Sequence, residues 1–147
     1  MRSLSVIALF GLALPLAAEH PKEPTDQERL QGEWVLMGLD VREKLVPAEK
    51  LAGTTLVIRK DKYTTVVKKK EYPATFALDP KQDPKHIDMF LPDDSGTPQL
   101  SKGIYKIEGD KLIICRGQAP GGDRPRNFVS SATNDVFVVT WERKPKP

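Results

Sequence analysis

The chain has 147 residues, which is enough for one domain. Charged residues make up 29% of it and hydrophobic residues 39%, a balance typical of a globular protein rather than a disordered one. The formal net charge is only +3, and one of these charges belongs to Arg2, which argues against a nucleic-acid-binding protein. The 13 prolines and 10 glycines favour short strands joined by turns over long helices.

The first residues have the layout of a secretory signal peptide. Arg2 provides a positive start, an apolar run follows from Leu4 to Leu14, and small residues at Ala17 and Ala18 precede a polar stretch. The run is too short to span a bilayer comfortably, and no cysteine follows it that could carry a lipid anchor. We therefore expect residues 1–18 to be removed and the protein to be exported, to the periplasm or to the cell exterior. No membrane span is expected in the mature protein.

The rest of the chain predicts a single domain. A polar tether is expected over residues 19–24, one folded domain over residues 25–143 and a frayed tail over residues 144–147. Thr25 and Glu28 have the spacing of a capping box, which predicts a short helix over residues 26–31.

After this helix the apolar residues alternate as they do in strands. Gly109-Asp110 is a turn that favours a β-hairpin, and Lys60-Asp61 predicts a second one. A helical turn is expected over residues 48–51. The eight expected strands cover residues 33–40, 55–60, 62–68, 74–78, 86–91, 103–108, 111–116 and 136–142. This pattern predicts an all-β fold, a small eight-stranded antiparallel up-and-down β-barrel, because closure removes both sheet edges. A two-sheet sandwich is the alternative.

Gly32-Glu33-Trp34 stands directly after the short helix, at the start of the first strand. This placement resembles the G-x-W signature of the lipocalin superfamily, in which the tryptophan closes the base of the barrel. In that superfamily an arginine from the end of the last strand stacks on the tryptophan, and Arg143 stands at the matching place here. The resemblance implies structural roles for Gly32, Trp34 and Arg143, with a stacking energy of roughly 0.5–2 kcal/mol.

A closer likeness covers nearly all of the chain after the leader. The chain resembles an uncharacterised family of exported lipocalin-like domains that is abundant in planctomycete bacteria. The segments that carry this likeness are LQGEWVLMGLDVREKLVPAEKLAGTTLVIRKDKYTTV, TFALDPKQDPKHIDMFL, GIYKIEGDKLIICR, GGDRPRNF and VFVVTWERK. The resemblance implies a fold and export, and it implies no activity.

The sequence predicts no catalytic residues, no metal site and no cofactor. Cys115 is the only cysteine, so it cannot form an intramolecular disulfide, and the apolar residues before it favour a buried side chain over a nucleophile. A Cys–His pair would have to combine Cys115 with His86, because His20 lies in the tether. No histidines or cysteines have the spacing of metal ligands. The acidic stretch over residues 93–96 is expected to be a solvated turn.

Three arginines mark the only candidate binding residues. Arg116, Arg124 and Arg126 bracket a loop that contains Gly121-Gly122. Guanidinium groups beside glycine backbone amides can bind a carboxylate or a phosphate. The alternative is a polar loop whose arginines pair with nearby acids such as Asp123.

The leading functional hypothesis is an exported, non-enzymatic binding module that holds a small apolar or amphipathic ligand in the barrel, by analogy at the level of fold. One alternative is a solid-core envelope or interaction protein that acts through surface loops such as residues 117–126, because a short domain can fill its own barrel. A hydrolase-type enzyme is the other alternative. A cavity of about 300 Å³ or more would favour the first hypothesis over the second, and convergent titratable side chains would favour the third. The sequence predicts no nucleic-acid partner and specifies no oligomeric state.

Overall fold

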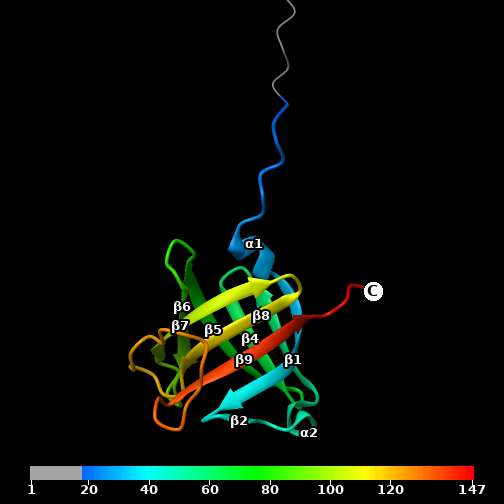
Figure 1. Ribbon diagram of the computed structural model, residues 1–147. Coiled ribbons are helices and arrows are strands. Elements are labelled where there is room, and N and C mark those ends of the chain that lie inside the picture. The colour runs from blue at the N-terminus through cyan, green and yellow to red at the C-terminus, as the bar shows by residue number, and fades with distance from the viewer. Residues whose placement is uncertain (1–17) are drawn as a thin grey trace, which may run out of the picture.

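The computed structural model describes residues 18–147, so the expected signal peptide lies almost entirely outside the described residues. Over this range the chain forms two short helices and nine strands, and all strands belong to one antiparallel sheet (Figure 1). The elements are α1 (Asp26–Leu30), β1 (Gly32–Val41), β2 (Lys44–Leu45), α2 (Ala48–Leu51), β3 (Thr54–Arg59), β4 (Lys62–Val67), β5 (Lys70–Asp79), β6 (Lys85–Pro92), β7 (Pro98–Glu108), β8 (Lys111–Gly117) and β9 (Val136–Arg143).

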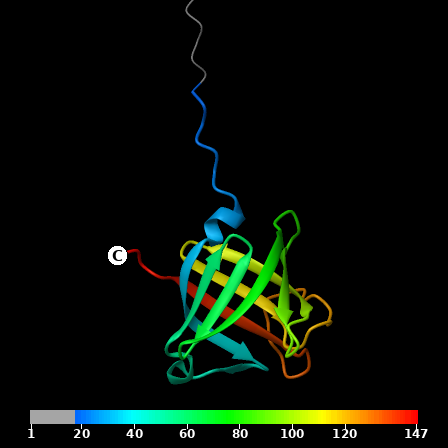
Figure 2. The ribbon, with the colours of Figure 1, turned by 180° about the vertical axis from the view of Figure 1, so that it is seen from behind.

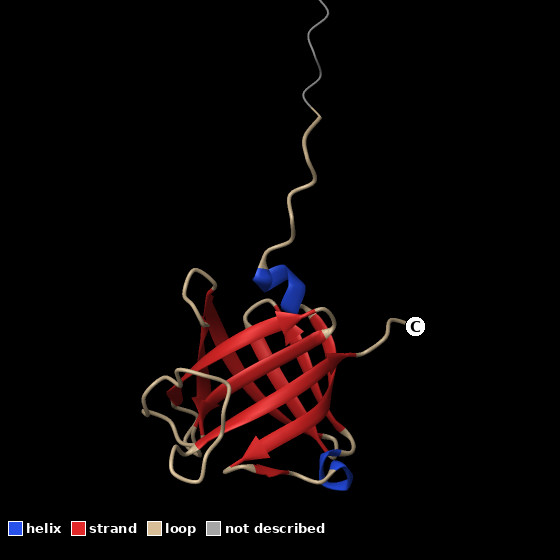
Figure 3. Cartoon of the chain, viewed as in Figure 1, coloured by secondary structure: helices blue, strands red, loops and turns tan. Residues whose placement is uncertain are grey.

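The sheet closes on itself because β1 and β9 are hydrogen-bonded to each other. Leu36 of β1 lies opposite Trp141 of β9, and Trp34 lies opposite Arg143. The strands from β3 to β9 follow in chain order, so eight strands make an up-and-down barrel, and β2 is a short addition beside β1 (Figure 3). The predicted all-β barrel is therefore confirmed, and residues 18–147 do not form two separate sheets.

Some strands are longer than predicted. β5 begins at residue 70 rather than 74, because Lys68 and Lys69 have positive φ angles of 49° and 69° and form a tight turn that pairs the two strands from that point. β7 begins at Pro98 rather than at residue 103, and its proline stands at the first position of the strand, where a proline is tolerated. Lys144, expected in the frayed tail, donates its backbone N–H to the carbonyl oxygen of Glu33 over 2.9 Å.

Helix α1 covers one end of the barrel. Its capping box is formed, since the Thr25 hydroxyl accepts from the Glu28 N–H and the Glu28 carboxylate accepts from the Thr25 N–H. The carboxylate of Asp26 accepts hydrogen bonds from Lys85 Nζ over 2.6 Å and from the Tyr105 hydroxyl over 2.7 Å, which ties the helix to β6 and β7. No helix among residues 18–147 has the length and apolar character that a membrane-spanning helix needs.

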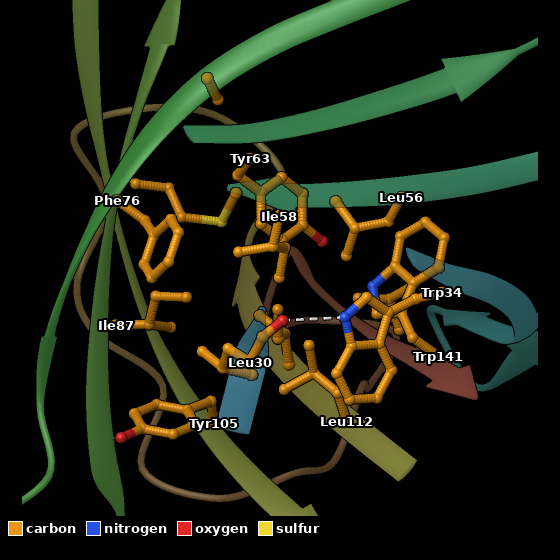
Figure 4. Packing of buried hydrophobic residues seen from close by; sticks show 14 residues of the cluster. Leu30, Trp34, Leu56, Ile58, Tyr63, Phe76, Ile87, Tyr105, Leu112 and Trp141 are labelled. Atoms are coloured by element: carbon orange, nitrogen blue, oxygen red, sulfur yellow. Dashed lines mark hydrogen bonds between the residues drawn. The ribbon is translucent and has the colours of Figure 1, made fainter. Parts of the chain in front are cut away.

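The interior of the barrel beside α1 is packed with large side chains (Figure 4). Trp34 is fully buried there, and its Nε1 donates a hydrogen bond to the carbonyl oxygen of Leu30 over 3.0 Å. Tyr63 and Phe76 meet edge to face with 6.3 Å between their ring centroids. Further members of this core are Leu56, Ile58, Ile87, Tyr105 and Leu112, and the same cluster continues toward the other end of the barrel with Met89, Ile114 and Trp141.

A second, smaller cluster lies on the outer face of the barrel, beneath the long connection between β8 and β9. Ile104, Cys115 and Val136 are buried there, and Phe128 and Val138 pack against them. Burial raises the pKa of the Cys115 thiol to about 11. The cysteine is therefore a packed, protonated side chain, as its apolar neighbours in the sequence predict.

Candidate ligand site in the barrel

A pocket of about 690 Å³ opens at the end of the barrel opposite α1. Figures 1 and 2 show α1 and α2 at opposite ends, and Leu51 of α2 forms part of the pocket wall. Most of the wall is apolar. Its interior side chains include Leu36, Leu39, Met89, Leu91, Ile114 and Val139.

Short side chains at a few inward positions on β3, β4 and β5 contribute to the space in the pocket. Along β3, Ile58 lies near α1 and Thr54 lies at the opposite end of the strand. Along β5, Phe76 fills the core near the base, whereas Ala74 lines the pocket. Thr65 of β4 also lines it. Short side chains at these inward positions leave a space that the packed base does not have.

Two polar groups lie at the floor of the pocket. Burial raises the pKa of the Tyr63 hydroxyl, and the positive charge of Arg116 and the indole N–H of Trp141 offset only part of this increase. The Trp141 Nε1 is buried, and no acceptor among the described residues meets hydrogen-bond geometry with it. Because this Nε1 atom is inaccessible to solvent, the Tyr63 hydroxyl is the group of the two that can donate to a molecule in the pocket.

Of the three arginines that the sequence predicts as binding residues, Arg116 belongs to this site. It follows Leu112 and Ile114 on the inward face of β8 and lines the pocket. Its guanidinium lies over the ring of Phe137, with 4.4 Å between Cζ and the ring centroid. Burial lowers the pKa of Arg116, and the neighbouring Tyr63 offsets part of the decrease.

The other two predicted arginines do not share this site. Arg124 lies against the outer face of the barrel, where its Nη2 forms an ion pair with Asp88 over 2.7 Å and its Nη1 donates to the Gly103 carbonyl oxygen over 2.6 Å. Arg126 is exposed. The loop therefore does not gather the three guanidinium groups, and Arg124 pairs with an acid, although with Asp88 rather than with the expected Asp123.

The residues predicted to close the base lie together at the opposite end of the barrel. The guanidinium of Arg143 stacks on Trp34, and it also donates to the carbonyl oxygens of Gln31 and Arg29. Gly32 has a φ of 123°, and a Cβ at this position would lie 3.5 Å from Arg143 Nη1.

The structure separates the residues of the hypothetical Cys–His pair. Ile104 of β7 pairs with His86 on one side and with Cys115 on the other, so a whole strand stands between them. At the usual strand spacing their backbones are about 10 Å apart. Among residues 18–147, no group of three or more His, Cys, Asp or Glu side chains is arranged to hold a metal ion.

The sequence analysis did not identify Tyr63 or Trp141 as site residues. A usable signal was present in the alternation of Leu112, Ile114 and Arg116, which predicts that the arginine faces the barrel interior once the barrel is assumed. The assembled site is an apolar pocket with a guanidinium on its wall and a hydroxyl at its floor, a combination that suits an amphipathic small molecule. No protein-family model, curated protein or solved structure matches this chain.

Proposed function

We propose that this protein is a non-enzymatic binding module that holds a small apolar or amphipathic molecule in the open end of its barrel. The observation that carries the proposal is the pocket of about 690 Å³, whose walls are mostly apolar. This volume lies within the range of small-molecule sites and exceeds the roughly 300 Å³ at its lower limit. In a protein with a solid core, side chains would fill such a space, because protein interiors are normally close-packed.

The two titratable groups deepest in the pocket, Tyr63 and Arg116, favour binding over catalysis. Tyr63 has a raised pKa and stays protonated near neutral pH, so it is a poor general base. Arg116 is a permanent cation and can neither accept nor release a proton at that pH. These two groups are suited to orienting a ligand.

We further propose that the protein is exported and works in the periplasm or outside the cell. The support is the signal-peptide pattern of residues 1–18 and the likeness to the exported lipocalin-like family. Small apolar molecules are poorly soluble in water, so they need a protein carrier to cross an aqueous compartment such as the periplasm. A binding module would supply one.

Binding can be measured with N-phenylnaphthylamine, a neutral dye whose emission increases in an apolar environment. We expect saturable binding of one dye molecule to each protein molecule. Thr65→Phe should fill part of the pocket, since Thr65 lines it. Losing contacts worth about two methylene groups, at ~0.8 kcal/mol each, should weaken dye binding about tenfold.

The matched control is Thr55→Phe, which adds the same side chain to the outer face of β3. Thr55 pairs with Val35 and alternates with the inward Thr54 and Leu56. It should leave the dye affinity unchanged within about twofold. Dye binding that is absent, or that both variants weaken equally, would contradict the proposed function.

A further inference from the structure

Arg116 places a positive charge inside the barrel without a matching negative one. Its side chain lines the pocket, and no carboxylate among the described residues lies within ion-pair distance of it. Its Nη1 donates to the Gly117 carbonyl oxygen over 3.2 Å, at the upper end of the usual range, and to the Ser101 hydroxyl over a long 3.4 Å. Within residues 18–147, its Nη2 and Nε atoms meet no acceptor.

Two other part-buried arginines, Arg124 and Arg143, show how a guanidinium can be satisfied in this chain. Arg124 uses both Nη atoms, on Asp88 and on two backbone carbonyl oxygens. Arg143 also uses both, on two backbone carbonyl oxygens, and its Nε lies 3.6 Å from a carboxylate oxygen of Asp110. Arg116 thus differs from both of them, because most of its five N–H donors remain available.

The glycine at position 103 lets the Arg116 side chain fit inside the barrel, although burying its charge is unfavourable. Gly103 lies opposite Arg116 on the neighbouring strand, and a Cβ at Gly103 would come within 3.1 Å of the Arg116 Cβ. Burying a charge without a counter-charge is unfavourable, as the lowered pKa of Arg116 reflects. Stacking on Phe137 stabilises the cation only in part and leaves the in-plane N–H donors free to bind another group.

Charged side chains around the mouth of the barrel also favour an anionic ligand. The turn between β4 and β5 contains the exposed Lys68 and Lys69, and the flanking Val67 and Glu71 line the pocket. Lys50 of α2 lines it from the other side. Glu71 is the one acidic side chain among the described lining residues, and it is exposed. With Lys50 and Arg116 positive and Glu71 negative, the lining residues carry a net charge of +1, which favours anions over cations.

We infer, on the basis of the function proposed above, that the ligand is an anionic amphipath whose head group pairs with Arg116 while its alkyl chain fills the apolar pocket. A guanidinium binds carboxylates and phosphate monoesters in the same bidentate manner, so both head groups belong to this chemistry. The Tyr63 hydroxyl, which lines the pocket, is a further donor for such a head group.

The test compares ligands that share one alkyl chain and differ in the head group. Decanoate, decyl phosphate, decanol and decyltrimethylammonium would each displace N-phenylnaphthylamine from the full chain. A charge-assisted pair in a partly buried site predicts that at least one of the two anions binds roughly 10- to 100-fold more tightly than decanol. The cation should bind more weakly than decanol. The ratio between the two anions shows which head group the site prefers.

Arg116→Gln should remove this preference, lowering the affinity for the preferred anion roughly 10- to 100-fold. It should change the affinity for decanol less than about threefold, which also shows that the variant is folded. Arg126→Gln is the matched control, because it removes the same charge from an exposed position and should change neither affinity by more than about twofold. Arg116→Lys keeps the charge but loses the planar fork, so it should restore part of the preference.

Equal binding of the anions and decanol by the unaltered protein would overturn the inference while leaving the proposed function intact. An equal loss of anion affinity in Arg116→Gln and Arg126→Gln would overturn it as well. If neither the dye nor any alkyl ligand binds, the proposed function itself is wrong and the inference falls with it. The comparison of head groups on the unaltered protein decides the matter even if Arg116→Gln does not fold.

Discussion

The guanidinium of Arg143, at the end of β9, lies over the indole of Trp34 near the start of β1, with 4.2 Å between Cζ and the ring centroid. The same guanidinium donates hydrogen bonds to the carbonyl oxygens of Gln31 and Arg29 at the end of α1. One side chain therefore joins the last strand, the first strand and the helix that covers the base. This contact closes the end of the barrel opposite the pocket.

Arg143→Ala should lower the free energy of unfolding by about 1–2 kcal/mol, because it removes a stacked cation, its packed methylene groups and its hydrogen bonds. Arg59→Ala, at an exposed position, should cost at most ~0.5 kcal/mol. Trp34→Phe should cost more than Arg143→Ala, since it also opens a void in the core. Chemical denaturation of the single and double variants should show a combined loss smaller than the sum. Strict additivity with a nearly silent Arg143→Ala would mean that the stacking contributes nothing.

Asp26 gives α1 a pH-dependent attachment. Partial burial alone would raise the pKa of Asp26, but hydrogen bonds from Lys85 and Tyr105 and the charges of Lys85 and Arg29 outweigh it, so the pKa lies below the ordinary value of 3.8. Because the folded pKa is the lower one, the stabilisation is fully present above about pH 4 and is lost as the pH falls through the folded value.

Asp26→Asn should therefore destabilise the protein by about 1–2 kcal/mol at pH 7 and by clearly less near pH 2. Asp61→Asn is the matched control, because Asp61 is exposed and its side chain forms none of the ion pairs of the described residues. Urea unfolding at both pH values would measure the effect. A difference between Asp26→Asn and the unaltered protein that is the same at both pH values would rule out the carboxylate as the source.

Cys115 should react slowly with alkylating reagents in the folded protein. Its side chain is fully buried and its pKa is raised to about 11, so very little thiolate is present at neutral pH. Iodoacetamide labelling followed by mass spectrometry should be slow in native buffer and fast in denaturant at the same pH. A Thr133→Cys, Cys115→Ala variant, with its thiol at an exposed position, should react quickly under native conditions. Rapid native labelling of Cys115 would mean that the outer cluster does not cover it.

Gly103→Ala should destabilise the barrel by about 1–3 kcal/mol, because the new Cβ would lie 2.9 Å from the Cys115 carbonyl oxygen, closer than real Cβ contacts allow. Gly122→Ala should change stability by less than ~0.5 kcal/mol, since the nearest heavy atom to its Cβ lies 3.9 Å away. Thermal unfolding of both variants would measure the difference. A Gly103→Ala protein as stable as the Gly122→Ala protein would show that the two strands can separate at no cost.

The alternation of inward and outward residues was sufficient to predict the barrel and most of its strands. It was not sufficient where charges and prolines interrupt the pattern, as in Lys70 and Pro73 at the start of β5. These residues still pair with β4, because the backbone turn at Lys68-Lys69 sets the register and the side chains there face solvent or the mouth. Local sequence says little about a register that a turn imposes.

The candidate site was only partly predictable for a different reason. The sequence groups Arg116 with Arg124 and Arg126 because the three are close along the chain, yet of these three only Arg116 lines the pocket. The difference depends on which face of β8 is the inside of the barrel, and this follows from closure of the whole sheet. The size of the pocket depends on the combined volumes of side chains such as Thr54 and Ala74 on separate strands, which no single segment reveals.

The two tryptophans allow the central claim to be tested in the unaltered protein. Trp141 lines the pocket, and its N–H meets no acceptor among the described residues, whereas the Trp34 N–H is bonded to Leu30 in the closed base. A ¹⁵N-labelled sample has one indole N–H signal for each of its 2 tryptophans, and Trp→Phe variants assign them. If the open end of the barrel binds an apolar molecule, titration with decanol should shift the Trp141 signal saturably and leave the Trp34 signal nearly unchanged. A Trp141 signal that does not move, or moves only together with that of Trp34, would contradict the account.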